Sequence, residues 1–589
     1  ILILVGIVAA IAVTIFKPSS GYVSSSSIVE YSIAVLPFDD MSSEGDTEWF
    51  CSGVTEDILT QLSKIKGLKV ISRTSTERYK NTDKSIPEIA KELGVVYVVE
   101  GSVRKHNDDV RITSQLINAS DEHIWADNFD AKMTDIFKTQ EDVAKQIVQQ
   151  LKIKISPEEE KNLSAFPTNN IEAYEAFNRG LNFFNNNDFE KGIAFFEKAI
   201  KLDPDFADAY AELAFIHFNN FMNNRASDSL KIIENIDKAL TLNPNSSRAN
   251  SYKGVILNFV NKKPDEGLVY LERALQLNPS NSRAHTMMAG YYAFDPKNND
   301  DDYAKALYHI NKAVELDPFL LQANRFKINI LTQSGKIDLA EAHFLEKSSL
   351  FSEGEKTFFS FNIIDERARL SKKINQEEEI KIYNNAIKKY PYNENRFIAR
   401  LAGAYDAIYN DDETYLEYSN KAYILDSTSV VIARQLHAAL VENGLFEEAL
   451  KFQTSDHIKQ MMHRGNNMLQ LQQYYHYHKG EYEITREILN DSMMVNWRSQ
   501  RALNYAQLGE LDKVNEILPT ISSINKAFTF AILKQRDSMY YYLNKDDVNS
   551  TQAKFPNSRS EFNPYRKEQR YIEFLKKHHF PIDKQKNQK

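Results

Sequence analysis

Residues capable of catalysis or metal binding are few in this chain, and their spacing argues against a shared site. His476 and His478 are two positions apart, so on a helix they point to different faces and do not form a metal pair. The acidic run at 298–302 lacks the glycine and the distal glutamate of a calcium loop, and we expect it to cap the next helix. The sequence has no G-x-G-x-x-G, phosphate-binding loop, H-E-x-x-H or G-x-S-x-G. We therefore expect no catalytic residue, no cofactor and no metal in this chain.

Composition narrows the possible partners. The single cysteine, Cys51, excludes intramolecular disulfides and multi-cysteine zinc sites, and it leaves the cellular compartment open. It has no evident base beside it, so we interpret it as a small, half-buried hydrophobic residue. A net charge of −9 argues against a broad nucleic-acid surface, because binding phosphates needs concentrated lysine and arginine. What remains is binding of a protein or a peptide.

The elements that would carry such binding are helical repeats. Four similar segments, KAIKLDP, KALTLNP, RALQLNP and KAVELDP, end in prolines spaced 40, 35 and 39 residues apart, at Pro204, Pro244, Pro279 and Pro318. Tetratricopeptide repeats have a period of about 34 residues. Gly254 and Gly267 fall where the two helices of one repeat should cross. We predict an all-α superhelix of eight or nine repeats over residues 169–545, irregular at 350–390 and closed by a capping segment at 546–589.

The first helix of each repeat should face the concave side of this superhelix and line a groove. Arg248 and Arg283 fall at the same position of adjacent repeats, where they could hold acidic groups of an extended peptide. The alternative is that the groove residues pack within the array, and that the arginines pair with acidic residues of a neighbouring helix. The candidate partner-binding residues are Phe177, Leu181, Phe184, Phe215, Phe218, Arg248, Val255, Asn258 and Arg283.

A small mixed α/β domain is predicted over residues 32–155, followed by a linker at 156–168. SIAVLPF (32–38) is a nearly continuous apolar run, which predicts a buried strand. Ser85 and Glu88 form a capping box for a helix that ends at Gly94. The element order is βαβαβββα. We interpret GVTED (53–57) as the start of a helix, with its acidic residues near the positive end of the helix dipole; the alternative is a ligand site.

This domain resembles a known family. SIAVLPF, FCSGVTEDILTQLSKIKGLKVISRTS, EGSVRK, RITSQLI and HIWADNFD occur in the same order as in the TolB-like N-terminal domain of bacterial membrane-bound regulators. The resemblance implies one transmembrane helix before the domain and tetratricopeptide repeats after it. It also implies a class III adenylate/guanylate cyclase or a winged-helix DNA-binding domain further upstream. The chain departs from the family at Ser52, where an acidic residue usually precedes the glycine.

The chain begins with the apolar stretch ILILVGIVAAIAVTIF. A signal peptide is one interpretation, but no basic segment precedes the stretch, and its small-x-small match at 10–12 is followed by more apolar residues. We therefore expect a transmembrane helix at 1–17, truncated at its start and contacting the membrane through residues 1–16, and then a flexible linker at 18–31. The weakly basic flank favours a single-pass inner-membrane protein whose bulk is periplasmic.

The expected fold class is multidomain: a transmembrane helix, a small mixed α/β TolB-like domain and an all-α tetratricopeptide superhelix. The expected function is the membrane-anchored sensory region of a bacterial signalling regulator, whose groove binds a protein or peptide and signals through the transmembrane helix. The alternative is the regulatory portion of a membrane-bound adenylate/guanylate cyclase with its catalytic domain upstream of residue 1. Neither function places an enzyme or a nucleic-acid surface within this chain.

Overall fold

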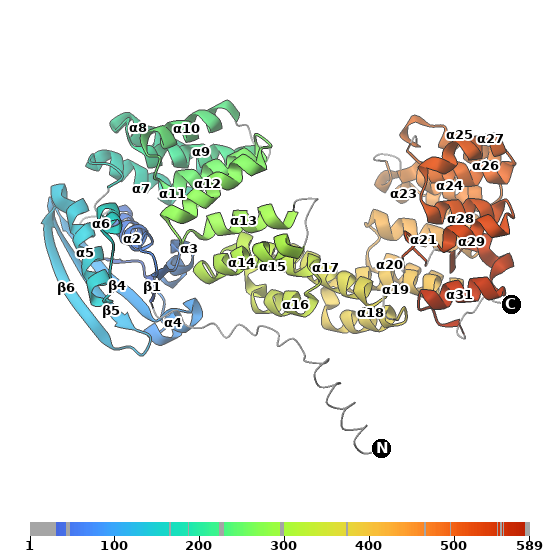
Figure 1. Ribbon diagram of the computed structural model, residues 1–589, viewed down its shortest axis with the longest axis horizontal. Helices are drawn as coiled ribbons and strands as arrows, with labels where there is room; N and C mark the ends of the chain where they lie inside the picture. The colour runs from blue at the N-terminus through green and yellow to red at the C-terminus, as the bar shows by residue number, and fades with distance from the viewer. Residues whose placement is uncertain are drawn as a thin grey trace, which may run out of the picture. The chain divides into compact units, whose positions relative to one another are not determined.

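An α/β domain is followed by paired helices in the computed structural model (Figure 1). The structure describes residues 31–42, 47–163, 166–185, 188–222, 229–294, 300–372, 375–463, 467–494, 496–549, 552–553, 556–557 and 559–582. The chain divides into two units, Ile1–Ile330 and Leu331–Lys589.

The sheet of the α/β domain consists of β1 (Ser32–Val35), β2 (Asp39–Asp40), β3 (Lys69–Val70), β4 (Tyr97–His106), β5 (Asp109–Asn118) and β6 (His123–Lys132). Its strand order is β3-β1-β4-β5-β6, and β2 pairs with β4. Strand β1 is parallel to both β3 and β4, whereas β4, β5 and β6 form an antiparallel ribbon. The predicted strands are confirmed, and the mixed sheet follows from the helices that connect β1, β3 and β4.

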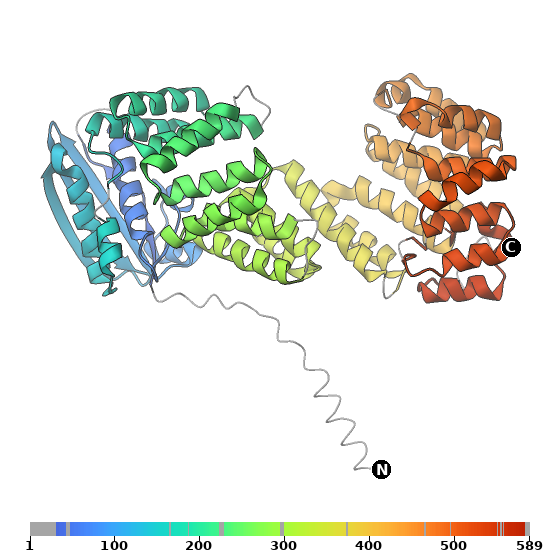
Figure 2. The same cartoon turned by 45° about the horizontal axis from the view of Figure 1, so that its top comes forward.

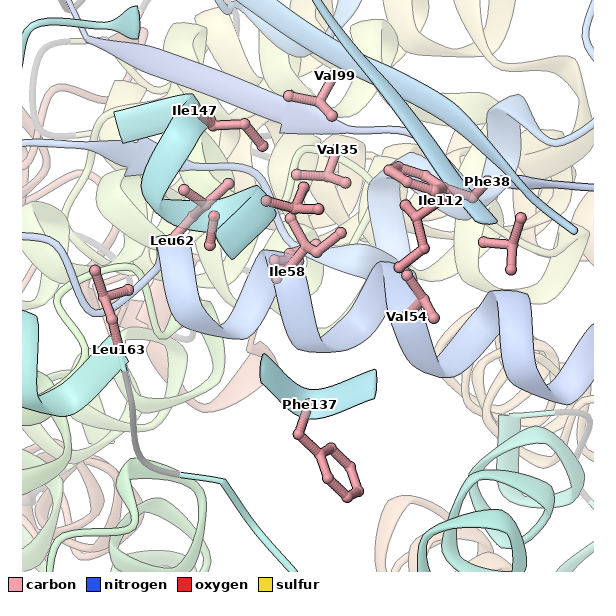
Figure 3. Close-up of a cluster of buried hydrophobic side chains, with 14 of the residues drawn as sticks. Val35, Phe38, Val54, Ile58, Leu62, Val99, Ile112, Phe137, Ile147 and Leu163 are labelled. Carbon is pink, nitrogen blue, oxygen red and sulfur yellow. The ribbon is translucent and has the colours of Figure 1, made fainter. Parts of the chain in front are cut away.

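Helices cover both faces of this sheet because β1 is apolar on both sides. Ile33 and Val35 belong to the core formed with α2 (Glu48–Leu62), α5 (Ile136–Gln150) and α6 (Pro157–Leu163), part of which Figure 3 shows. Ala34 and Leu36 belong to a second core with α4 (Ile86–Leu93) on the opposite face. The short helix α3 (Arg73–Thr76) follows β3. The apolar run at 32–38 therefore has the two-sided burial that it predicted.

The predicted ends of α4 are also confirmed. The Ser85 amide donates a hydrogen bond to Glu88 Oε2 at 2.8 Å, and Gly94 ends the helix in the left-handed conformation with φ of 63°. The prediction for GVTED was wrong. Helix α2 begins at Glu48, so Glu56 and Asp57 lie in the second half of the helix rather than at its positive end.

Helices α7 to α15 continue the first unit as successive antiparallel pairs (Figure 2). Gly254 and Gly267 lie where α11 crosses α12: a Cβ atom added at Gly254 would be 2.8 Å from the Gly267 oxygen, and one added at Gly267 would be 2.6 Å from the Gly254 oxygen. Only glycine allows this approach, as the repeat pattern predicted. The helices are α7 (Ile171–Asn185), α8 (Phe189–Leu202), α9 (Ala207–Met222), α10 (Ser229–Leu242), α11 (Ser247–Phe259), α12 (Pro264–Leu277), α13 (Ser282–Phe294), α14 (Asp300–Leu316) and α15 (Leu321–Gln333).

The second unit consists of further helices, and the segment at 350–390 contains α17 and α18. Its last helix packs into a cluster with α28 and α29 through Tyr571 and Phe574. The helices are α16 (Ile337–Glu346), α17 (Glu353–Ser371), α18 (Glu378–Lys389), α19 (Glu394–Tyr409), α20 (Asp412–Leu425), α21 (Val430–Glu442), α22 (Phe446–Thr454), α23 (Asp456–Met461), α24 (Asn467–His478), α25 (Tyr482–Leu489), α26 (Arg498–Leu508), α27 (Leu511–Ile517), α28 (Ser523–Ile532), α29 (Arg536–Leu543) and α31 (Gln569–Lys577).

The expected fold class needs one correction. The stretch at 1–17 that we expected to form a transmembrane helix lies outside the described residues. Of the helices that the structure does describe, none has the length and apolar character needed to cross a membrane. The described architecture is a small mixed α/β domain followed by helical repeats, without a membrane-spanning element in that part of the chain.

Candidate functional site

The α/β domain is seated against the repeats through contacts between residues far apart in sequence. The Val70 amide donates a hydrogen bond to Ser280 Oγ at 3.3 Å across 210 positions. Ser75 Oγ donates to Asp317 Oδ1 at 2.5 Å across 242 positions. The repeats that follow the domain in sequence therefore pack back onto the β3 edge of its sheet.

The first repeat helix also completes the core of the α/β domain. Tyr174 of α7 is 1% exposed, and its ring packs edge-on against Phe137 of α5 with centroids 5.0 Å apart. The Tyr174 hydroxyl donates a hydrogen bond to Asp57 and accepts one from Gln140 Nε2 at 3.2 Å. Burial raises the pKa of the Asp57 carboxyl to about 7, although the bond from Tyr174 opposes the shift. Near neutral pH this carboxyl is therefore partly protonated.

A cavity of about 530 Å³ lies between the α/β domain and the repeats, and we name it the junction cavity. Helix α2 borders it from the domain, and the N-terminal ends of α11 and α13 border it from the repeats. Its lining is rich in charged and polar side chains, which include Glu56, Lys64, Arg73, Arg248, Ser251 and Arg283.

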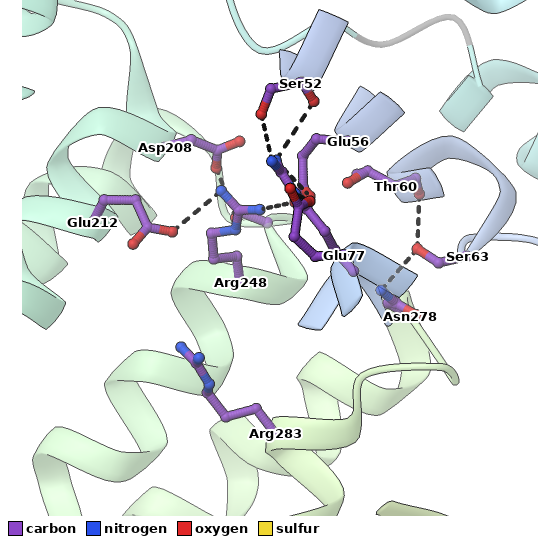
Figure 4. Close-up of polar contacts among 12 residues, drawn as sticks. Ser52, Glu56, Thr60, Ser63, Glu77, Asp208, Glu212, Arg248, Asn278 and Arg283 are labelled. Atoms are coloured by element: carbon purple, nitrogen blue, oxygen red, sulfur yellow. Dashed lines mark hydrogen bonds and ion pairs between the residues drawn. The ribbon is translucent and has the colours of Figure 1, made fainter. Parts of the chain in front are cut away.

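Arg248 links the two sides of the junction cavity (Figure 4). Its Nη2 atom lies 2.9 Å from Glu56 Oε1 of α2, and its Nη1 atom lies 3.2 Å from Glu212 Oε1 of α9. Arg73 Nη1 approaches the other oxygen of Glu56 at 3.5 Å. Burial raises the pKa of Glu212, although the positive charge of Arg248 favours its ionised form. Arg248 thus neutralises two carboxylates, and its loss would leave a buried charge unpaired.

Arg283 has a different environment. Its guanidinium lies over the rings of Phe215 and Tyr252, 4.6 and 5.5 Å from their centroids, and donates a hydrogen bond to the Tyr252 hydroxyl at 3.1 Å. Within the described residues no carboxylate forms an ion pair with it. Both Arg283 and Arg248, which Figure 4 labels, belong to the lining of the cavity. Of the three arginines in the lining, Arg73 and Arg248 form ion pairs and Arg283 forms none among the described residues.

Most of the predicted groove residues lie inside the repeats instead. Those that are at most 8% exposed are Phe177, Leu181, Phe215, Phe218 and Val255, and those that are half-buried are Phe184 and Asn258. Their packing between helices corresponds to the alternative interpretation of the sequence. Of the predicted set, the structure brings Phe177, Arg248 and Arg283 together at the junction cavity.

Sequence reasoning missed the half of the cavity that α2 contributes. We interpreted the acidic pair Glu56-Asp57 as part of a helix start because acidic residues favour the positive end of a helix dipole. A stronger signal was present: Phe50, Val54, Ile58 and Leu62 recur every four residues and are all fully buried. That spacing indicates one continuous helix and places the acidic pair within it.

The three residues that the sequence analysis considered for chemistry, Cys51, His476 and His478, are buried or have partners. Cys51 is 3% exposed, and burial raises the pKa of its thiol to about 12, so the thiol stays protonated. His476 Nδ1 contacts Glu481 at 2.5 Å, and His478 Nε2 contacts Arg559 at 3.2 Å, so the two rings have separate partners. Among the described residues no cluster of His, Cys, Asp and Glu could hold a metal ion.

A second opening lies in the other unit, between α20, α21 and α22, and we name it the distal groove. It has a volume of about 690 Å³. Leu416, Tyr423, Leu440 and Phe452 give it an apolar lining with partly exposed side chains. Its charged residues are Glu413, Glu417, Glu448 and Lys451, all of them exposed.

Comparisons with known proteins describe two parts of the chain. Residues 29–151 match the model of the HilA/YgeH-like transcriptional regulator, second domain, a different description from the TolB-like family. Residues 173–206 match a tetratricopeptide repeat. Both descriptions are of regulatory or binding modules, which agrees with the expectation that this chain is not itself an enzyme.

Individual relatives match over limited lengths. A protein of Rhizobium meliloti (strain 1021) described as "Putative adenylate cyclase 3" is 38% identical over 196 residues, which cover 33% of this chain and 33% of that protein. The pilus biogenesis factor PilW is similar in structure with a TM-score of 0.30 and 17% identity, over 39% of this chain and 96% of PilW. A human IFIT1 structure has a TM-score of 0.26 and 16% identity, over 54% and 77% of the two chains. The chain thus spans about a third of the curated relative, and it is similar to a HilA/YgeH-like domain over residues 29–151 and to a tetratricopeptide repeat over residues 173–206.

Proposed function

We propose that this chain is the protein-binding part of a bacterial regulator, in which the tetratricopeptide repeats act as a scaffold and the distal groove receives a segment of the partner. The matches to a regulator domain and to a tetratricopeptide repeat support the general class. The observation that carries the proposal is the distal groove, because an apolar surface that remains accessible between helices is typical of a site for another protein.

The charges around the groove indicate the chemistry of the partner. Glu413 and Glu417 are four residues apart on α20, so they lie on one face of the helix, and Glu448 of α22 is also part of the lining. In the part of the chain that the structure describes, none of the three forms an ion pair. An amphipathic helix that places leucines in the groove and lysines beside these glutamates would match it.

Synthetic peptides test this proposal. A helical peptide with leucines at i, i+4 and i+7 and flanking lysines should bind the full chain, whereas the same peptide with flanking glutamates should not. Glu448→Lys should weaken binding of the lysine peptide by about three- to ten-fold, since an exposed ion pair contributes up to about 1 kcal/mol and reversal adds repulsion. The neighbouring Glu447→Lys, on the same helix but outside the lining, is the matched control. Fluorescence anisotropy measures both; equal binding of the two peptides would show that the groove does not select a basic helix.

A second candidate is that the chain regulates an adenylate cyclase activity. The relative described as an adenylate cyclase supports it. On this proposal, native protein isolated with an antibody against the α/β domain should form cyclic AMP from ATP. Residues 1–589 alone should form none, because no phosphate-binding loop is recognisable in the sequence. Absence of cyclic AMP from the native protein would remove this candidate and leave the scaffold proposal unaffected.

A further inference from the structure

The junction cavity has the size and the lining of a site for a small polar molecule. Its volume of about 530 Å³ falls within the usual range for ligand pockets, about 300–1,000 Å³. Pockets for apolar ligands are lined mainly by hydrophobic side chains, whereas this one is bordered by arginine, lysine, serine and asparagine.

Arg283 carries a positive charge that forms no ion pair among the described residues, although Glu212 and Asp317 lie near enough to interact with it. Its ring contacts with Phe215 and Tyr252 fix the guanidinium in place but leave donor groups free for a ligand. Arg248 and Arg283 are each the second residue of a helix, α11 and α13, so the positive ends of both helix dipoles meet the cavity. A carboxylate or a phosphate would satisfy this arrangement.

Four side chains in the lining have a buried polar atom without a hydrogen-bond partner: Gln61, Ser72, Asn178 and Ser251. Ser251 is 1% exposed and its Oγ atom has no hydrogen-bond partner. Gln61 is 4% exposed and its Oε1 atom has none either. Buried polar atoms are paired in the great majority of cases, so four unpaired atoms in one cavity are available to a bound ligand. Oε1 is an acceptor, and a hydroxyl group on the ligand would donate to it.

The acidic residues of the cavity, Glu56, Asp57, Asp208 and Asp317, all have partners within the protein; Asp208 Oδ1 accepts a hydrogen bond from Ser246 Oγ at 3.2 Å. Glu56 is already paired with Arg248 and Arg73. Burial raises the pKa of Asp57 to about 7, which reduces its negative charge near neutral pH, and burial also raises the pKa of Asp317. The cavity is therefore suited to an anion.

We propose that the junction cavity binds a small organic anion that also carries hydroxyl groups, such as a hydroxy acid or a sugar phosphate. Arg283 holds the acidic group, and Ser251 and Gln61 bond to the hydroxyls. The lining comes from both the α/β domain and the repeats. A bound ligand therefore contacts both and stabilises the packing of the domain against the repeats. This site lies in a different unit from the distal groove and takes a different ligand, so the two proposals succeed or fail independently.

The test uses the full chain with citrate, glucose 6-phosphate and uncharged glucose, at constant ionic strength set with sodium chloride. Citrate or glucose 6-phosphate should raise the melting temperature by a few degrees at about 10 mM, and glucose should not. Comparison of the two anions tells a carboxylate site from a phosphate site. Arg283→Gln should weaken binding about ten-fold or more, and Arg283→Lys should weaken it less because the charge is kept. Arg104→Gln, on an exposed residue of β4, is the control and should bind like the wild type.

Modification of the wild-type chain gives a second readout that does not depend on how the variants fold. Phenylglyoxal reacts with accessible arginines, and peptide mass spectrometry shows which ones. The bound anion should protect Arg283 and leave Arg104 reactive. If neither anion raises the melting temperature at about 10 mM, or if Arg283 is not protected, the proposal is wrong.

Discussion

Gly53 lies in the middle of α2, where this helix passes α7. A Cβ atom at this position would be 2.6 Å from Asn178 Nδ2 and 2.7 Å from the Tyr174 hydroxyl. Both neighbours are buried, and the Tyr174 hydroxyl is held by its bonds to Asp57 and Gln140. The absence of a side chain at Gly53 is therefore what allows the α/β domain and the first repeat to approach so closely.

Gly53→Ala should destabilise the first unit. In an exposed helix interior, glycine to alanine stabilises by about 1 kcal/mol, so a loss of about 1–3 kcal/mol here would come from the overlap with Tyr174. Gly403→Ala in α19 is the control, because its Cβ would meet nothing closer than 4.0 Å and it lies in the second unit, so it should leave the unfolding of the first unit unchanged. Thermal unfolding by tryptophan fluorescence in a Trp497→Phe background follows the first unit, since the two other tryptophans, Trp49 and Trp125, belong to it. A stabilised Gly53→Ala would contradict the contact.

Asp57 should make the first unit less stable as pH rises. Its pKa is about 7 in the folded chain and near 3.8 in the unfolded one, so between these values the folded state holds a proton that the unfolded state has released. The stabilisation is complete below about pH 4 and is lost as pH approaches about 7, by an amount on the order of a few kcal/mol. Tyr174, Gln140, Glu56 and Arg248 surround the carboxyl and set this shift.

Asp57→Asn should remove this dependence while keeping an oxygen that accepts the bond from Tyr174. Urea unfolding of the first unit at about pH 4.5 and pH 8 should show a larger gain for the variant at the higher pH. Asp83→Asn, on an exposed residue of the same unit, should show no such difference. A gain that is equal at both pH values would mean that the carboxyl is charged throughout.

At the scale of the element, the local periodicity of the sequence was sufficient to predict those segments that pack against their neighbours in sequence. The strand at 32–38, the capped helix at 86–93 and the crossing at Gly254 and Gly267 were all predictable, because each depends on residues within a few turns or within one repeat. The junction cavity was not predictable. Arg248 and Glu56 are 192 positions apart, and no spacing rule relates residues at that distance.

The segment after the last repeat illustrates another long-range contact. Asn557 is fully buried, and its Nδ2 atom donates to the carbonyl oxygens of Ala407 and Ile408 at 2.9 and 3.1 Å. These carbonyls belong to the last turn of α19, which has no partners for them within the helix. The closing segment thus packs on the last repeat and also caps a helix 150 positions earlier.

Asn557→Ala should loosen the end of α19 without affecting the first unit. Loss of two buried hydrogen bonds should cost about 1–3 kcal/mol and speed amide exchange near the end of that helix. Asn384→Ala is the control, because its side chain donates only to Ile380 in its own helix and is partly exposed. Hydrogen exchange followed by mass spectrometry measures both variants. Unchanged exchange in 404–409 after Asn557→Ala would show that the cap is dispensable.

At the scale of the whole molecule, the α/β domain and the first repeats share one hydrophobic core, so we do not expect them to unfold independently. The core of the domain includes Leu163 of α6 and Tyr174 of α7, both outside the segment at 32–155 that its strands and helices predicted. The segment expected as a linker, 156–168, contains α6 and contributes to that core. The domain as a folding unit therefore includes part of the repeat array.

A fragment of residues 32–155 should be much less stable than a fragment of residues 32–330. The shorter fragment loses Tyr174, Leu163 and every polar contact with the repeats, and it exposes the apolar surface they cover. Thermal unfolding and binding of a hydrophobic dye compare the two. If both melt at the same temperature, the repeats contribute nothing to the domain.

The contact between Ser75 and Asp317 can form only after a delay during synthesis of the chain. The two residues are 242 positions apart, and ribosomes add roughly 5–20 residues per second, so Asp317 is made roughly 12–50 s after Ser75. During that interval the sheet edge at β3 has emerged but its partner has not. A nascent chain must keep this edge from pairing elsewhere, and a ribosome that stops early releases a domain with an open edge. The α/β domain can therefore reach its complete structure only after the first four repeats have been translated.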